Sequence, residues 1–295
     1  MDVIKYKYLF IGFSAVLTVL AVFGMFYFGF REGIDFAGGT FWQMRFNSEL
    51  SLEQMNGFLS GEDLEAMVRQ GETLRDFSVR MKEIDEVKHQ ELLKTLQEKF
   101  GALEELSFSS IGPAIGSELR GNALLAFFMV LLGISLYVAF AFRKVSYPVS
   151  SWKYGIVTLI TLFHDALIPA GFFTWLGWKY GAELDTNFIV AVLVVMGFSV
   201  HDTIVVFDRI RENLLLSKNK EDLGRIINES VNQTFARSVN TSLTLVLVLV
   251  ALYLFGASSL NYFTLLILIG TITGTYSSIF VASPMLTFFY RKGGK

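Results

Sequence analysis

The stretch GFSVHDTIVVFDRIREN, residues 197–213, decides the fold class because it closes a long apolar run that contains an aspartate. Asp202 lies within the run Phe188–Phe207, and no oppositely charged residue stands beside it. An apolar run of about 20 residues is typical of a membrane-spanning helix. A carboxylate inside hydrocarbon is costly unless a partner balances it. The rest of the sequence therefore has to supply a membrane setting and a partner for Asp202.

The composition is that of a membrane protein. The chain has 295 residues, of which 53% are hydrophobic and only 18% are charged, and its mean hydropathy is +0.49. The net charge of -2 gives no electrostatic support to nucleic-acid binding. The chain has no cysteine, which excludes both a disulfide framework and a thiolate metal site.

Six stretches are long and apolar enough to cross a bilayer. The first is too long for a signal peptide and lacks a cleavage pattern, so residues 1–30 are interpreted as an uncleaved first transmembrane helix. The fifth stretch starts with polar residues, and Pro284 is expected to kink or end the sixth. The predicted spans are Tyr8–Phe30, Ala123–Phe142, Ile156–Leu176, Asn187–Phe207, Ser238–Phe255 and Tyr262–Tyr290.

Basic residues predict the orientation of these spans, because short cytoplasmic loops carry an excess of Lys and Arg. Four basic sets fall on one side, which places both termini in the cytoplasm. The opposite side holds only Lys179 in its short loops. The four sets are Lys5 and Lys7; Arg143, Lys144 and Lys153; Arg209, Arg211, Lys218, Lys220 and Arg225; and Arg291, Lys292 and Lys295.

The polar piece between the first two spans, residues 31–122, is predicted to be an inserted extracytoplasmic α+β domain. Its pattern reads strand, helix, strand, strand, helix, strand, which is the ferredoxin-like βαββαβ order; a less regular α+β cap is the alternative. Residues 123–295 then hold five further transmembrane helices and a cytoplasmic loop, 208–236. The elements expected in the domain are strand Thr40–Phe46, a helix capped by Ser51 and Gln54, a hairpin of Leu64–Gln70 and Thr73–Lys82 about Gly71, helix Asp85–Phe100 and strand Leu103–Ile111.

Two predicted spans contain ionisable side chains at membrane depth. The third holds His164 and Asp165, and the fourth holds His201 and Asp202. Helical rise puts Asp165 roughly 13 Å from Ile156, near mid-bilayer. Neighbouring residues of a helix point about 100° apart, so neither His-Asp pair is expected to act as a unit. The alternative role for each histidine is a hydrogen bond to a backbone carbonyl or another helix, and too few ligands converge for a metal site.

The fifth span offers a partner for Asp202. Arg237 heads a polar stripe at helical spacing that is expected to point into the bundle and to bring Arg237 opposite Asp202. Burial favours a protonated carboxyl and a nearby arginine favours the ionised form, which is the balance that a proton relay requires. A static buried ion pair is the alternative. The supporting polar residues are Gln233, Asn240, Thr241 and Thr244 on this span, and Ser199 on the fourth.

The stretch GIDFAGGT, residues 33–40, is predicted to be a tight entry from the membrane into the first strand. Gly33, Gly38 and Gly39 do not have dinucleotide-binding spacing, and they are expected to allow unusual backbone angles. The stretch SSIGPAIGSEL, residues 109–119, is interpreted as the return to the membrane. Asp35 would then lie near the outer interface as a further candidate to exchange protons.

These motifs, with HDAL at 164–167, occur in the order and topology of a known family. The chain resembles the SecF family of the bacterial Sec protein-export machinery, which is related to the RND superfamily. The resemblance implies one half of a proton-driven pump that pairs with SecD, associates with the SecYEG channel and promotes late export of the translocating preprotein. Asp202 and Arg237 fall where this family has its proton-transport residues, whereas His201 stands where the family often has asparagine.

The resemblance also implies a location and a class. It implies a multi-pass protein of the bacterial cytoplasmic (inner) membrane, embedded in the lipid bilayer, with protons as the coupling ion, no other cofactor and no enzymatic activity. Residues 31–122 would contact the emerging preprotein. Two other functions remain open from the sequence. One is half of an RND-type exporter of small molecules or lipids, and the other is a structural assembly subunit.

Overall fold

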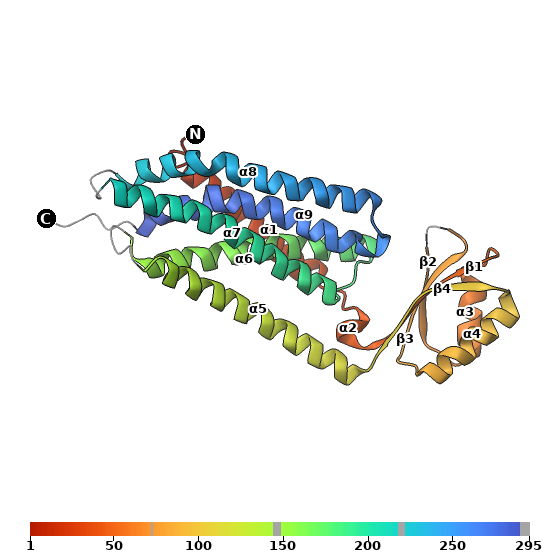
Figure 1. Ribbon diagram of the computed structural model, residues 1–295. Coiled ribbons are helices and arrows are strands. Elements are labelled where there is room, and N and C mark those ends of the chain that lie inside the picture. The colour runs from red at the N-terminus through yellow and green to blue at the C-terminus, as the bar shows by residue number, and fades with distance from the viewer. Residues whose placement is uncertain (72, 144–148, 218–221, 290–295) are drawn as a thin grey trace. The chain divides into compact units, whose positions relative to one another are not determined.

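The computed structural model describes residues 1–71, 73–143, 149–217 and 222–289 (Figure 1). The chain divides into two compact units. Residues 1–31 and 125–295 form the helical unit, and residues 32–124 form the α/β unit.

The helical unit confirms the six predicted spans, since the described residues contain six helices long and apolar enough to cross a membrane. The last span is not one regular helix. After α9 it passes through a π-helical turn, η2, and then the short elements α10 and η3, the first of which contains Pro284. The bounds are α1 (Lys7–Phe28), α5 (Pro113–Ala141), α6 (Ser151–Tyr180), α7 (Thr186–Leu216), α8 (Leu223–Phe255), η1 (Ser258–Leu260), α9 (Asn261–Ser277), η2 (Ser278–Ala282), α10 (Ser283–Met285) and η3 (Leu286–Phe289).

The predicted cytoplasmic loop 208–236 is largely helical where the structure describes it. Helix α7 continues to Leu216, and α8 already begins at Leu223. The reason is packing, because the apolar stripe at the start of α8, from Leu223 to Val231, is buried against the rest of the unit. The orientation residues Lys144, Lys218, Lys220, Arg291, Lys292 and Lys295, and the span end Tyr290, lie outside the described residues.

Small residues allow α9 to approach α7 closely (Figure 1). Gly270 and Gly274 form a GxxxG pair, the spacing that lets membrane helices come together. A Cβ atom at Gly270 would lie 2.2 Å from a methyl carbon of Val195, and one at Gly274 would lie 2.9 Å from the Cβ of Ser199. This contact therefore depends on the missing side chains.

The close approach predicts a specific loss of stability. We expect Gly270→Val to lower the thermal unfolding temperature in lipid nanodiscs, because overpacking a buried contact costs about 1–3 kcal/mol. Gly133→Val on α5 is the matched control, since nothing lies within 4 Å of a Cβ there. Equal losses in both variants would show that helix propensity, and not the α7–α9 contact, determines the effect.

The α/β unit has the predicted order of strands and helices. Its four-stranded sheet has the order β2-β3-β1-β4, with every neighbouring pair antiparallel. Side chains of one sheet face pack with Met55 and Phe58 of α3 and Leu92 and Leu96 of α4. Ser51 and Gln54 form the predicted capping box. The bounds are α2 (Ile34–Ala37), β1 (Gly39–Phe46), α3 (Leu52–Gly61), β2 (Ala66–Gln70), β3 (Asp76–Met81), α4 (Glu86–Phe100) and β4 (Leu103–Ile111).

The glycines of GIDFAGGT differ in what they do. Gly38 and Gly39 have φ angles of 74° and 117°, which confirms the predicted unusual backbone at these two positions. A Cβ at Gly38 would lie 2.9 Å from the Cα of Pro113. Gly33 has a φ of -73°, so the prediction is wrong for Gly33, which caps the short helix α2 in an ordinary extended conformation.

Candidate functional site

A fully buried carboxylate, that of Asp165, lies where α6, α7 and α9 meet. Its Oδ2 atom accepts hydrogen bonds from the hydroxyls of Ser199 on α7 and Ser277 on α9, the latter at 2.7 Å. Its Oδ1 atom lies 2.7 Å from Nδ1 of His164. Three partners from three helices therefore satisfy this carboxylate, and no lysine or arginine among the described residues forms an ion pair with it.

The expectation that His164 and Asp165 do not act as a unit is wrong. The two side chains start about 100° apart on α6, but their torsion angles bring the imidazole back to the carboxylate. Ser199 and Ser277 hold the carboxylate in this orientation. The second imidazole nitrogen, Nε2, is buried and has no hydrogen-bond partner among the described residues.

The backbone next to this site is irregular. The π-helical turn η2 begins at Ser278, directly after Ser277, and such turns are frequent at functional sites. The Ser278 hydroxyl lies 2.8 Å from that of Thr203, and it donates to the backbone oxygen of Ser199 at 3.3 Å. A cluster of hydroxyls thus extends along α7 from Asp165 toward the turn that carries Asp202.

Asp202 is only 7% exposed and is less well satisfied than Asp165. Its Oδ1 atom accepts a 2.5 Å hydrogen bond from the hydroxyl of Ser238 on α8. Its Oδ2 atom is buried with no partner among the described residues. The predicted pairing of Asp202 with Arg237 is therefore wrong in this chain. Ser238, the next residue on α8, faces Asp202 instead.

The polar stripe of Arg237 does not point into the bundle of this chain, which corrects the prediction. The face of α8 that packs inward has a hydroxyl at every fourth position, namely Ser230, Thr234, Ser238 and Ser242. This spacing of small hydroxyls is the sequence signal that could have identified Ser238. The residues predicted to face inward, which are Gln233, Arg237, Asn240, Thr241 and Thr244, are all exposed on this chain.

Arg237 instead lines a polar pocket of about 280 Å³ at the end of α7 and the start of α8. Asp208, Arg209 and Glu212 line the same pocket. Arg209 hydrogen-bonds Gln233 at 2.5 Å and pairs with Glu212 at 2.6 Å. Within the described parts of the chain Arg237 forms no ion pair within 4 Å, so its positive charge is held near two carboxylates without a fixed partner.

The remaining candidates are dispersed. Ser199, predicted to support Asp202, supports Asp165 instead. Asp35 is partly exposed in the first turn of α2, in the α/β unit, and His201 is exposed. No group of three potential metal ligands exists among the residues that the structure describes.

Six membrane helices with two buried carboxylates and an inserted α/β unit define a multi-pass membrane protein with ionisable groups inside its bundle. Residues 91–292 match the family model described as protein export membrane protein SecD/SecF, C-terminal. The chain belongs to the SecD/SecF family of protein-export membrane proteins.

Several relatives share most of the chain. The protein translocase subunit SecF of Thermobaculum terrenum is 43% identical, over 99% of this chain and 95% of its own length. The SecDF protein of Bacillus subtilis is 36% identical over 95% of this chain, which spans only 37% of it. The crystal structure of SecDF from Thermus thermophilus matches with a TM-score of 0.81 at 34% identity, covering 98% of this chain and 38% of that one.

The geometry around Asp202 predicts a cross-linking pattern. The double variant Asp202→Cys/Ser238→Cys is expected to form a disulfide with copper-phenanthroline, because the two side chains are in contact. Asp202→Cys/Arg237→Cys, shifted by one residue on α8, is the control and is expected to react far more slowly. The chain has no other cysteine to interfere. If the Asp202→Cys/Arg237→Cys variant forms its disulfide faster than Asp202→Cys/Ser238→Cys, Asp202 faces Arg237 and not Ser238.

Proposed function

We propose that this chain is an accessory subunit of the Sec preprotein translocase that couples late protein export to the proton-motive force. The observation that carries the proposal is the buried Asp202 carboxyl, of which one oxygen is bonded to Ser238 and the other has no partner among the described residues. A carboxyl in this setting can change its protonation when its surroundings change, because burial favours the protonated form and an approaching positive charge favours the ionised form. The names of the relatives, protein translocase subunits, support the export role.

The proton route that we propose uses Asp202 as the main carrier. Arg237, in the polar pocket with Asp208 and Glu212, is close enough along α8 to approach Asp202 if the helices shift, because it adjoins Ser238. Asp165 with His164 forms a second, better satisfied site in the same bundle. Asp35 is a weaker candidate at the outer interface. Protons are the coupling ion, and the proposal includes no enzymatic step.

The exposed stripe on α8 supports a partner half. Polar side chains such as Asn240 and Thr244 lie beyond Ser238 along the membrane-spanning part of α8, where contact with lipid is unfavourable. SecDF relatives are more than twice as long as this chain and match it over about a third of their length. We propose that SecD covers this stripe and that the pair binds the SecYEG channel in the bacterial cytoplasmic membrane.

The proposed topology follows the basic loops. Both termini are cytoplasmic, and the α/β unit is extracytoplasmic, where it contacts the emerging preprotein. The order β2-β3-β1-β4 with both helices on one face supports a ferredoxin-like fold for this unit.

The proposed function is tested by replacing the carrier. Asp202→Asn keeps the shape and the Ser238 contact but removes the titrating carboxyl. We expect preprotein export into inverted membrane vesicles to lose its dependence on the proton gradient, while SecD still co-purifies with the chain. Glu98→Gln is the matched control, since Glu98 is 67% exposed and lies 3.9 Å from Lys94 at the surface, where such a pair contributes about 0–1 kcal/mol.

Two results would contradict the proposal. If Asp202→Asn abolishes assembly and leaves proton coupling unchanged in the remaining complex, the carboxyl has a structural role. If export is unchanged but cells become sensitive to drugs or lipids, the chain is half of an RND-type exporter.

The partner proposal has its own test. We expect Thr244→Trp to reduce co-purification of SecD, because a large ring on the stripe would obstruct the second half. Leu132→Trp on α5, a position that is 56% exposed but apolar, is the control and is expected to retain SecD. If the Thr244→Trp variant still co-purifies with as much SecD as the parent chain, the exposed polar stripe on α8 is not part of the contact with SecD.

A further inference from the structure

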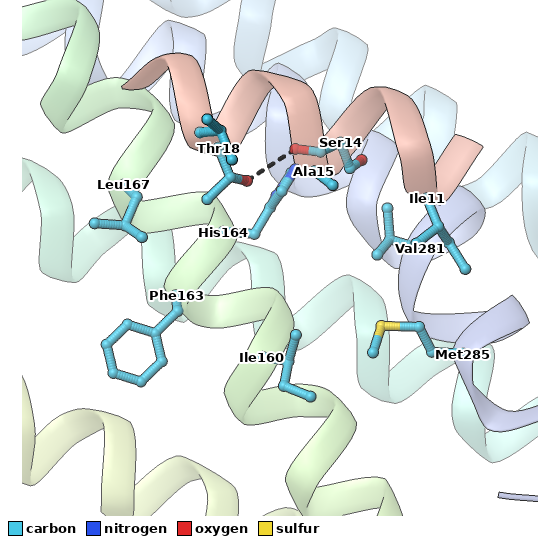
Figure 2. Close-up of a pocket in the computed structure, with 11 residues that line it drawn as sticks. Ile11, Ser14, Ala15, Thr18, Ile160, Phe163, His164, Leu167, Val281 and Met285 are labelled. Atoms are coloured by element: carbon cyan, nitrogen blue, oxygen red, sulfur yellow. Dashed lines mark hydrogen bonds between the residues drawn. The ribbon is translucent and has the colours of Figure 1, made fainter. Parts of the chain in front are cut away.

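A pocket of about 460 Å³ opens between α1, α6 and the irregular segment after α9 (Figure 2). Its volume lies in the range of small-molecule sites. Eight of its eleven lining residues are apolar. Val19 and Ile160 at the pocket are 66% and 43% exposed, so the pocket opens on the outer surface of the helical unit.

Two buried polar atoms in this apolar wall, Nε2 of His164 and Oγ of Ser14, have no hydrogen-bond partner among the described residues. His164 is 93% buried, and its side chain reaches from α6 toward Ser14 and Ala15 of α1 (Figure 2). Its Nδ1 atom is bonded to Asp165, and its Nε2 atom has no hydrogen-bond partner among the described residues. The nearby Thr18 hydroxyl already donates to the Ser14 carbonyl. A buried polar atom without a partner costs about 1–3 kcal/mol, so a molecule that supplies the missing hydrogen bond gains that contribution.

The pocket lies at membrane depth, and this determines the source of its occupant. His164 is thirteen residues into α6, roughly 20 Å along a helix of about 45 Å. A molecule that reaches this depth comes from the lipid phase. Water is the competing occupant, because Nε2 of His164 and the Ser14 hydroxyl together supply the two polar partners that an ordered water needs at the least.

The chemistry of the His164–Asp165 pair selects a hydroxyl group. With Asp165 ionised, Nδ1–H donates to the carboxylate and Nε2 is an acceptor. With the proton on Asp165, the carboxyl donates to Nδ1 and Nε2–H becomes a donor. A hydroxyl donates in the first state and accepts in the second, whereas a ketone or an ether can only accept.

We propose that this pocket binds a lipid-dissolved compound with an apolar body and a single hydroxyl group, which hydrogen-bonds Nε2 of His164. The inference goes beyond the proposed export function and does not depend on Asp202. It assigns a ligand to a part of the bundle that the proposed partner contact on α8 does not use. The hydroxyl can be aliphatic, as in a long-chain alcohol, or phenolic, as in an alkylphenol.

Nitrogen NMR of the full chain in lipid nanodiscs tests the proposal directly. The chain has only three histidines, so ¹⁵N-histidine labelling and a His164→Gln variant assign the Nε2 signal. We expect dodecanol or 4-dodecylphenol to shift this signal in a saturable manner, and dodecane to leave it unchanged. The comparison of the two hydroxyl compounds shows whether the aliphatic or the phenolic class binds more tightly.

Two variants on α1 separate binding in the pocket from general partitioning into lipid. Ala15 is exposed and lines the pocket, so Ala15→Phe fills it and is expected to weaken the apparent affinity about tenfold or more. Val16→Phe, one residue along at a position 57% exposed, is the matched control and is expected to bind like the parent chain.

Three results would overturn the proposal. The first is no saturable shift with either hydroxyl compound. The second is an equal shift with dodecane or in the Ala15→Phe variant. The third is a ligand-free Nε2 signal that receives magnetisation from water as strongly as exposed His201 does, which would mean that water occupies the pocket.

Discussion

The cost of placing a carboxylate in hydrocarbon is the constraint on which the helical unit depends. Asp165 is stabilised by its neighbour His164 on α6 and by the hydroxyls of Ser199 on α7 and Ser277 on α9, two helices that have to come close to α6. Gly274 makes the approach of α9 to Ser199 possible, since a side chain there would collide with it. The close packing of α6, α7 and α9 brings the two serine hydroxyls to Asp165. These hydrogen bonds in turn stabilise the packing of the three helices.

Much of the fold follows from local signals. The six spans could be predicted because apolar length is set by bilayer thickness, and helix α3 because Ser51 and Gln54 satisfy each other's backbone groups. Within the predicted cytoplasmic loop 208–236, polarity marks the membrane boundary but not the end of a helix, since α7 continues to Leu216 and α8 begins at Leu223. The apolar residues from Leu223 onward are buried by tertiary contacts that hydropathy does not report.

The candidate site was harder to predict, and the two errors have different causes. Helical spacing correctly separates the Arg237 face of α8 from the Ser238 face, but spacing alone cannot say which face packs inward. Small hydroxyls fit a close helix contact, and an arginine does not, so the face with serines packs inward. For His164 and Asp165, the error was to reason from the directions of the Cα–Cβ bonds alone, when Ser199 and Ser277 determine where the carboxylate lies.

The two carboxyls are unequal, and this inequality limits the roles each can have. Side chains from three helices hold the carboxylate of Asp165, which lies next to the π-helical turn that follows Ser277. The carboxyl of Asp202 accepts one hydrogen bond, from Ser238, on a helix whose neighbouring face is exposed. Asp202 is therefore the proposed proton carrier, because only one hydrogen bond from the residues that the structure describes holds its carboxyl. Arg237 lies on the exposed face of α8, where a subunit that covers this face would change the surroundings of its charge.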